Sequence, residues 1–154
     1  MRSRRRLLLQ TVLVDGSVLR NHLRNGVQAF ARADVRLIAA TARAQIGDSI
    51  NLDAAARDEF PEANRWDYVV SVPTMSHILA IEPHSAKYAE ISVVIAKKRH
   101  AVNYLRGHLR AGYWVAKWLW VSHGSVGFSR MERARRLLDQ NGIEFAGRLL
   151  RTFG

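Results

Sequence analysis

The sequence contains no cysteine, which excludes a disulfide framework, a zinc site built on thiolates and a cysteine nucleophile. Only 3 of its 154 residues are proline, and no apolar run approaches the roughly 18 to 20 residues that a membrane-spanning helix needs. Hydrophobic residues nevertheless make up 48% of the chain and charged residues 24%, unlike a disordered segment or a membrane protein. We therefore expect one globular domain without a membrane partner, suited to a reducing cytoplasm.

Acidic residues are the other scarce class, with 13 Asp and Glu against 24 Lys and Arg and a formal net charge of +11. Residues 78–154 hold 13 of the basic residues but only 5 of the acidic ones. Arginine supplies 20 of the basic residues, and its planar guanidinium suits bidentate contact with phosphate. The first functional hypothesis is therefore a polyanionic partner, nucleic acid above all, and the simpler alternative is charge that only maintains solubility.

The N-terminus begins with four arginines among its first six residues, followed by a short apolar stretch. Gln10 interrupts that stretch and Asp15 ends it, so we expect a basic arm rather than a secretory signal. This interpretation divides the chain into a leading element, residues 1–16, and a single α/β domain, residues 17–154.

Two apolar segments in the middle of the chain, residues 67–72 and 78–82, have the spacing of a β-hairpin. A long, cationic amphipathic helix is predicted for residues 89–109. The whole order of elements predicts an α/β fold with a single mixed β-sheet flanked by helices. The remaining elements predicted from apolar periodicity and caps are helices at 17–33, 34–46 and 129–140, and strands at 49–54, 116–122 and 143–150.

Two carboxylates fall at strand ends of the predicted hairpin, because Asp67 opens its first strand and Glu82 closes its second. Antiparallel pairing places these two ends side by side. Adjacent carboxylates repel each other unless a cation such as Mg²⁺ bridges them, and bound Mg²⁺ can activate water and stabilise charge on a phosphoryl oxygen. The alternative is that both are ordinary strand-end residues in water.

This arrangement resembles the PD-(D/E)XK nuclease superfamily, whose fold is restriction-endonuclease-like. The resemblance covers residues 17–122: a helix, three strands, a helix and a strand, with Asp67 on the second strand and Glu82 on the third. It implies that these acids bind Mg²⁺ (or Mn²⁺) and that a lysine two positions after the second acid helps to activate water. His84 occupies that lysine position here, and Trp66 occupies the position of the motif's proline.

The resemblance also implies where a displaced lysine would lie, since some members of the superfamily carry it on the following helix. Lys97 and Lys98 are the candidates here, provided that the helix runs back over the acids. His84, with an ordinary pKa near 6.5, is the other candidate for a base or a water-orienting group. Glu90 and Asp53 are candidates for additional acids, or else a capping residue and a strand-edge residue.

Basic side chains outside this cluster are candidates for contacts with a phosphate backbone, or else form a solvated surface. Tyr113, Trp114, Trp118 and Trp120 could stack on bases, although tryptophans on a strand more often belong to a core. The six histidines form no zinc-binding motif. The candidate phosphate contacts are Lys98, Arg99, Arg130, Arg133 and Arg136.

The sequence thus predicts a Mg²⁺-dependent or Mn²⁺-dependent nuclease that hydrolyses phosphodiester bonds in DNA or RNA. Its metal ligands would be Asp67 and Glu82, and its base or water-orienting group would be His84 or Lys97. The alternatives are a non-catalytic nucleic-acid-binding module on the same fold and a protein that binds an acidic partner protein. A homodimer is compatible with the resemblance, because many nucleases that cut both strands pair two active sites.

Overall fold

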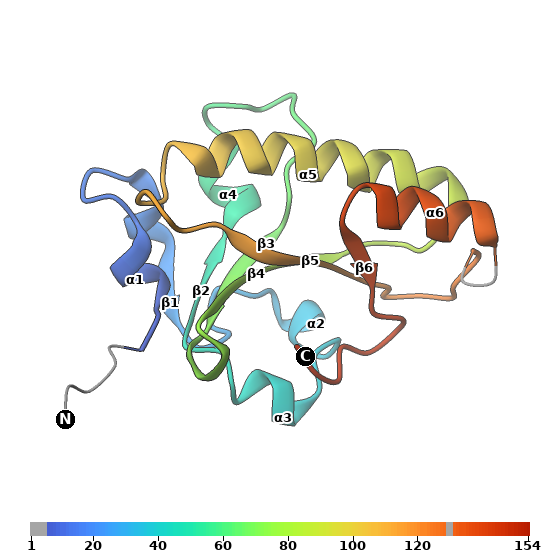
Figure 1. Ribbon diagram of the computed structural model, residues 1–154, viewed down its shortest axis with the longest axis horizontal. Helices are drawn as coiled ribbons and strands as arrows, with labels where there is room; N and C mark the ends of the chain where they lie inside the picture. Colours follow the sequence, from blue (N-terminus) through green and yellow to red (C-terminus); the bar gives the residue numbers. More distant parts are fainter. Residues whose placement is uncertain (1–5, 129–130) are drawn as a thin grey trace.

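The computed structural model describes residues 6–128 and 131–154 and contains one mixed sheet in which the strands follow chain order (Figure 1). The first four strands are antiparallel neighbours, whereas β4, β5 and β6 run parallel to one another. The predicted α/β class, with a single mixed sheet flanked by helices, is confirmed. The strands are β1 (Leu23–Asn25), β2 (Asp48–Asn51), β3 (Tyr68–Val72), β4 (His77–Pro83), β5 (Val115–Val121) and β6 (Ile143–Phe145).

Helices cover both faces of the sheet (Figure 1). The longest, α5 (Ile91–Arg106), crosses one face between β4 and β5, and α6 (Glu132–Gln140) lies on the same side between β5 and β6. None of the helices in the described part of the chain is long and apolar enough to cross a membrane. The other helical elements are α1 (Leu9–Val12), α2 (Arg32–Val35), α3 (Ala40–Arg43), α4 (Leu52–Ala56) and the 3₁₀ turns η1 (Val18–His22), η2 (Pro73–Met75) and η3 (Tyr88–Glu90).

Strand alternation divides the core into two layers, one on each face of the sheet. On β5, Trp118 and Trp120 join the layer beneath α5, whereas Leu119 and Val121 join the layer on the side of α2 and α3. Each layer removes one face of the sheet from water. Each fully buried large apolar side chain in it stabilises the fold by about 1.5 to 3 kcal/mol.

The β3–β4 hairpin is the element that positions the predicted acids. Its register pairs Tyr68 with Ile81, so Asp67 and Glu82 lie next to each other at the open end of the hairpin. At the closed end, η2 and Ser76, which has a φ of 52°, reverse the chain. Both strands of the hairpin, the long helix and β5 were predicted near their observed positions, and those predictions are confirmed.

The N-terminal third differs from the prediction of two helices at residues 17–33 and 34–46. The first of these forms η1 and then β1, because Leu23 pairs with Ile50 across the sheet and Gly26, with a φ of 50°, turns the chain. The second contains only the four-residue helices α2 and α3. Asp34, the first residue of the second predicted helix, lies inside α2, and its carboxylate accepts a hydrogen bond from the Tyr68 hydroxyl at 2.6 Å.

The ends of several other strands and helices differ from the predicted ones. The strand predicted at 49–54 ends at Asn51, because the Asn51 side chain accepts a hydrogen bond from the Ala54 N–H and begins α4. The strand predicted at 143–150 has only three residues. The predicted start of the helix at 129–140 lies partly outside the described residues. So does much of the basic arm, but Leu9 and Val12 of the expected leading element are buried in the core.

Candidate active site

Asp67 and Glu82 meet at the open end of the β3–β4 hairpin, on the face that α5 covers. Glu82 Oε1 accepts a hydrogen bond from the backbone N–H of Asp67 at 2.9 Å, which fixes the Glu82 carboxylate. The Glu82 side chain is completely buried, whereas 27% of the Asp67 side chain is exposed. The site thus consists of an anchored inner carboxylate and an outer carboxylate that solutes can reach.

Lys97 supplies the cation that faces both carboxylates. Its Nζ lies 2.5 Å from Glu82 Oε2 and 3.8 Å from Asp67 Oδ1. This contact is possible because α5 runs back over the sheet, which is the condition that the displaced-lysine hypothesis required. Lys98 does not reach the acids, since its Nζ donates a hydrogen bond to the Asn141 carbonyl and lies 5.5 Å from the centre of the Trp118 ring.

His84 lies between two carboxylates, with Nδ1 3.4 Å from Glu82 Oε2 and Nε2 3.0 Å from Glu90 Oε2. The hydrogen bond with Glu82 raises the pKa of His84, and the bond with Glu90 adds to it against the opposing effect of burial. The protonated ring that this favours donates protons, so the geometry fits an acid or an orienting donor better than a base. Glu90 joins the cluster through His84, which lowers the pKa of Glu90.

The electrostatics of the centre reflect two carboxylates that share one lysine. Burial, and then the nearby charge of Glu82, raise the pKa of Asp67 to about 7, although Lys97 opposes this. Burial by itself lowers the pKa of Lys97, but Glu82 and Asp67 more than offset it, so that the lysine pKa is raised and the ammonium stays charged. A further cation beside Asp67 would favour its ionised form.

Asp53, an additional acid in the sequence-based hypothesis, is held by two arginines. Its carboxylate forms ion pairs of 2.8 Å with both Arg57 and Arg65, and these outweigh burial and lower the pKa of Asp53. Arg65 also donates to the carbonyls of Phe60 and Pro61. Asp53 therefore braces the loop that leads into β3, a structural role that the sequence pattern did not indicate.

The donor set fits magnesium better than a cation that needs an all-protein cage. Among the described residues, no group of three or more His, Cys, Asp or Glu side chains could hold a metal ion. Magnesium is commonly bound through one or two carboxylates, with water and substrate phosphate completing its octahedral shell. Asp67 and Glu82 offer such a pair of hard oxygen donors, and the exposed part of Asp67 gives access to it.

The other predicted contact residues lie away from these acids. Arg99 is exposed on α5, and Arg133 and Arg136 are exposed on α6. Arg130 lies outside the described residues. Trp118 and Trp120 are buried in the core, as expected for tryptophans on a strand, so neither ring is available to stack on a base. The sequence reasoning also missed the Asp67 backbone N–H as a partner of Glu82, because a backbone donor leaves no signal in a sequence.

Comparison of the chain with models of protein families, with curated proteins and with solved structures gave no match. The resemblance to PD-(D/E)XK nucleases therefore stays a prediction. A functional assignment has to be argued from the site itself, since one fold hosts many activities.

Proposed function

We propose that this protein is a nuclease that depends on a divalent metal and has its reaction centre at Asp67, Glu82 and Lys97. The observation that carries the proposal is the position of Lys97 Nζ, 2.5 Å from one carboxylate and 3.8 Å from the other. Burying a lysine beside two acids costs desolvation free energy. Such buried charged clusters are typical of functional sites, and this one has the groups to bind a cation and a phosphate.

The two carboxylates would hold the metal. When bound, a divalent cation supplies Lewis acidity and stabilises negative charge on phosphoryl oxygens. Glu82 is anchored by the N–H of Asp67, so its position would not depend on the cation. Asp67 would be the adjustable ligand, because it is partly exposed and has a 3.8 Å contact with Lys97 rather than a close one.

His84 would supply a proton to the reaction, and Lys97 would supply hydrogen bonds. In hydrolysis a bond forms between water oxygen and phosphorus, and the bond from phosphorus to a sugar oxygen breaks. The water loses a proton to the solvent, and the leaving oxygen gains one. Lys97 stays protonated, so it would orient the water or stabilise a phosphoryl oxygen as a donor. His84, whose pKa is raised, is suited to protonate the leaving oxygen.

The surface charge supports nucleic acid as the substrate. The chain has a net charge of +11, and Arg99, Arg133 and Arg136 are exposed on the two helices that cover the site's side of the sheet. Arginines on such a surface neutralise backbone phosphates in a way that does not depend on base sequence.

A cleavage assay tests the proposal. Single-stranded DNA, duplex DNA and RNA would be incubated with Mg²⁺, Mn²⁺ or EDTA and the wild type, Asp67→Asn, Glu82→Gln and Lys97→Met, with Asp139→Asn as a control for an exposed carboxylate on α6. We expect metal-dependent cleavage that falls by about 10²-fold or more in the three site variants and is unchanged in the control.

One observation favours the alternative of a non-catalytic binding module. Glu82 is completely buried, and both of its oxygens already have partners in Lys97 and the Asp67 N–H, as in a purely structural ion pair. If the folded wild type cuts none of the substrates with either metal but binds them in a salt-sensitive way, the nuclease proposal is wrong and the binding module is correct.

A further inference from the structure

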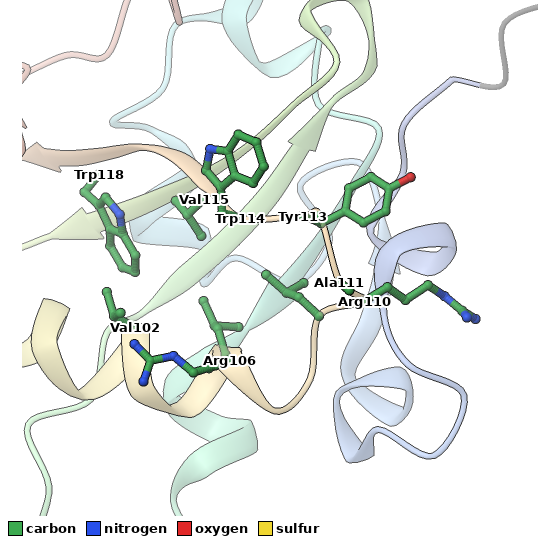
Figure 2. A pocket seen from close by; sticks show the side chains of 11 residues that line it. Val102, Arg106, Arg110, Ala111, Tyr113, Trp114, Val115 and Trp118 are labelled. Atoms are coloured by element: carbon green, nitrogen blue, oxygen red, sulfur yellow. The ribbon is translucent and has the colours of Figure 1, made fainter.

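A second feature lies at the other end of the sheet, where α5 ends and β5 begins. A groove of about 420 Å³ opens there. Figure 2 shows Val102 and Arg106 on the helix side of this groove, and Trp114, Val115 and Trp118 on the strand side. We call it the α5–β5 groove.

The α5–β5 groove displays aromatic rings that a stable fold would normally bury. Trp114 is 71% exposed, Tyr113 is 45% exposed and Val102 is 36% exposed. Seven large hydrophobic side chains are exposed in the described part of the chain, and these are three of them. Such a concentration of exposed apolar surface marks an interaction site rather than chance exposure.

The backbone holds these rings outward. The Tyr113 N–H donates to the Arg110 carbonyl at 3.2 Å, and Gly112, with a φ of 87°, occupies the third position of this turn. A type II turn needs a residue with positive φ at that position. Tyr113 closes this turn and Trp114 follows it directly, so the backbone next to both rings has a defined conformation, which lowers the entropic cost of binding to them.

The charge around the rings is of one sign. Arg106 and Arg110 line the groove, and no Asp or Glu is found among its lining residues. On the far side of the turn, Tyr113 and Trp114 also line a hollow of about 220 Å³ that has no acidic lining residue either. Arg110 pairs with Asp15, but Asp15 has 90% of its side chain exposed and does not line the groove.

We propose that the α5–β5 groove binds an unpaired segment of nucleic acid, with a base stacked on Trp114 and a backbone phosphate against Arg106. Aromatic platforms beside basic side chains are how single strands are bound without sequence preference. A paired base offers no free face to such a platform. The inference rests on the proposed function for its choice of nucleic acid as substrate, and it narrows that substrate to one with a single-stranded part.

The α5–β5 groove would anchor a strand without taking part in the reaction. Lys97 and Arg106 are nine positions apart on α5, which is about 13 Å of helix. Glu82 lies at the C-terminal end of β4, whereas the start of β5, next to Trp114, pairs with Ile78 at the other end. A strand held on Trp114 therefore has to be connected to the scissile phosphate by several nucleotides.

The test is a binding measurement in EDTA, so that it does not depend on cleavage. Fluorescein-labelled twelve-residue oligothymidylate and oligouridylate would be titrated with the wild type, Trp114→Ala, Trp114→Phe and Arg106→Gln, with a duplex of equal length for comparison. Arg148→Gln is the matched control, since Arg148 is exposed but lies outside the lining of the groove. Circular dichroism would verify that each variant is folded.

We expect Trp114→Ala to weaken single-strand binding by about 5-fold to 100-fold, the range for removal of one stacked base, and to change duplex binding much less. Trp114→Phe should keep most of the affinity because it keeps a ring. Arg106→Gln should reduce the slope of the logarithm of the binding constant against that of salt concentration, by the amount expected for the loss of about one phosphate contact. Arg148→Gln should have little effect on this slope or on the affinity.

Three results would overturn the inference: no binding of either oligonucleotide by the wild type, equal losses for single strand and duplex in Trp114→Ala, or unchanged binding in that variant. Unchanged binding together with a dimer that becomes a monomer in Trp114→Ala, as measured by sedimentation, would assign the groove to a second copy of the chain. If Trp114→Ala loses single-strand binding and the wild type cleaves no substrate, the groove binds single strands but the proposed nuclease activity is wrong.

Discussion

Asp67 is the titrating residue with the clearest consequence for stability. Its pKa is raised from 3.8 to about 7 by burial and by Glu82, so between these pH values the folded state binds more protons than the unfolded state. The free energy of unfolding therefore falls as the pH rises through this window. A carboxylate such as Asp67, which destabilises the metal-free fold at neutral pH, is what the proposed cation site would require.

We expect Asp67→Asn to be more stable than the wild type at pH 8 in EDTA, by on the order of 1 to 2 kcal/mol once partial exposure is allowed for. The difference should shrink at pH 5, where the folded wild type is already protonated. Urea unfolding at both pH values would measure this. A difference that is the same at pH 5 and pH 8 would show that Asp67 does not titrate in this range.

Lys97 and Glu82 form the most buried ion pair of the site, with Glu82 fully inaccessible. Lys97→Met leaves this carboxylate without its cation, which should cost about 3 to 5 kcal/mol of stability. The double variant Lys97→Met with Glu82→Gln should recover part of the loss, because glutamine can still accept from the Asp67 N–H. A double-mutant cycle by urea unfolding measures the coupling, and strictly additive losses would contradict the pairing.

At the scale of elements, a buried carboxylate attaches α1 to the sheet. Asp48 on β2 is 6% exposed and accepts hydrogen bonds from the N–H groups of Leu9 and Gln10 and from the Ser71 hydroxyl. The apolar residues of α1 alone would not fix its orientation, because a four-residue helix has little intrinsic stability.

Asp48→Ala should lower the free energy of unfolding by about 2 to 3 kcal/mol, because it leaves buried donors without an acceptor. The amides of Leu9 and Gln10 should also exchange faster with solvent. Chemical denaturation and hydrogen exchange would measure the two effects, with the exposed Asp58→Ala as the control. Equal stability of the two variants would mean that α1 is held by its apolar contacts only.

The elements that were predicted correctly carry strong local patterns. The hairpin has two apolar runs around a turn, and α5 has a long amphipathic period, so local preference and tertiary structure agree there. Leu19, Leu23 and Val27 have helical spacing as well, but Leu23 pairs with Ile50 instead. Short-range periodicity cannot report a strand partner that lies 27 positions away in the sequence.

The candidate site was predictable from the sequence where its contacts are local, and not where they depend on tertiary structure. The adjacency of Asp67 and Glu82 follows from hairpin pairing, which is local. The approach of Lys97 depends on the direction of α5 over the sheet, which the sequence left open between Lys97 and Lys98. The contact of His84 with Glu90 depends on η3, a turn that no pattern indicated.

For the whole molecule, the distribution of charge determines how nucleic acid would be bound. The helix α6, which carries Arg133 and Arg136, lies on the same side of the sheet as α5 (Figure 1). The helix α2, which begins with Arg32 and is capped by Arg36, lies on the opposite side. All four arginines are exposed. A nucleic acid that reaches the reaction centre should therefore contact the α6 pair and not the α2 pair.

The double variant Arg133→Gln, Arg136→Gln should reduce the slope of the logarithm of the duplex binding constant against that of salt concentration by up to about 1.8. The double variant Arg32→Gln, Arg36→Gln has the same net charge and should keep the slope of the wild type. Fluorescence anisotropy at several salt concentrations measures both. Equal slopes for the two variants would indicate that only the net charge matters.

The central claim is that Asp67 and Glu82 form one cation site beside Lys97. The measurement that tests it most directly is a Mn²⁺ titration followed by electron paramagnetic resonance, without any substrate. The account predicts one Mn²⁺ bound per chain in the wild type and in Asp139→Asn, and none at the same concentrations in Asp67→Asn. Equal Mn²⁺ binding by the wild type and Asp67→Asn, or no binding by the wild type, would contradict it.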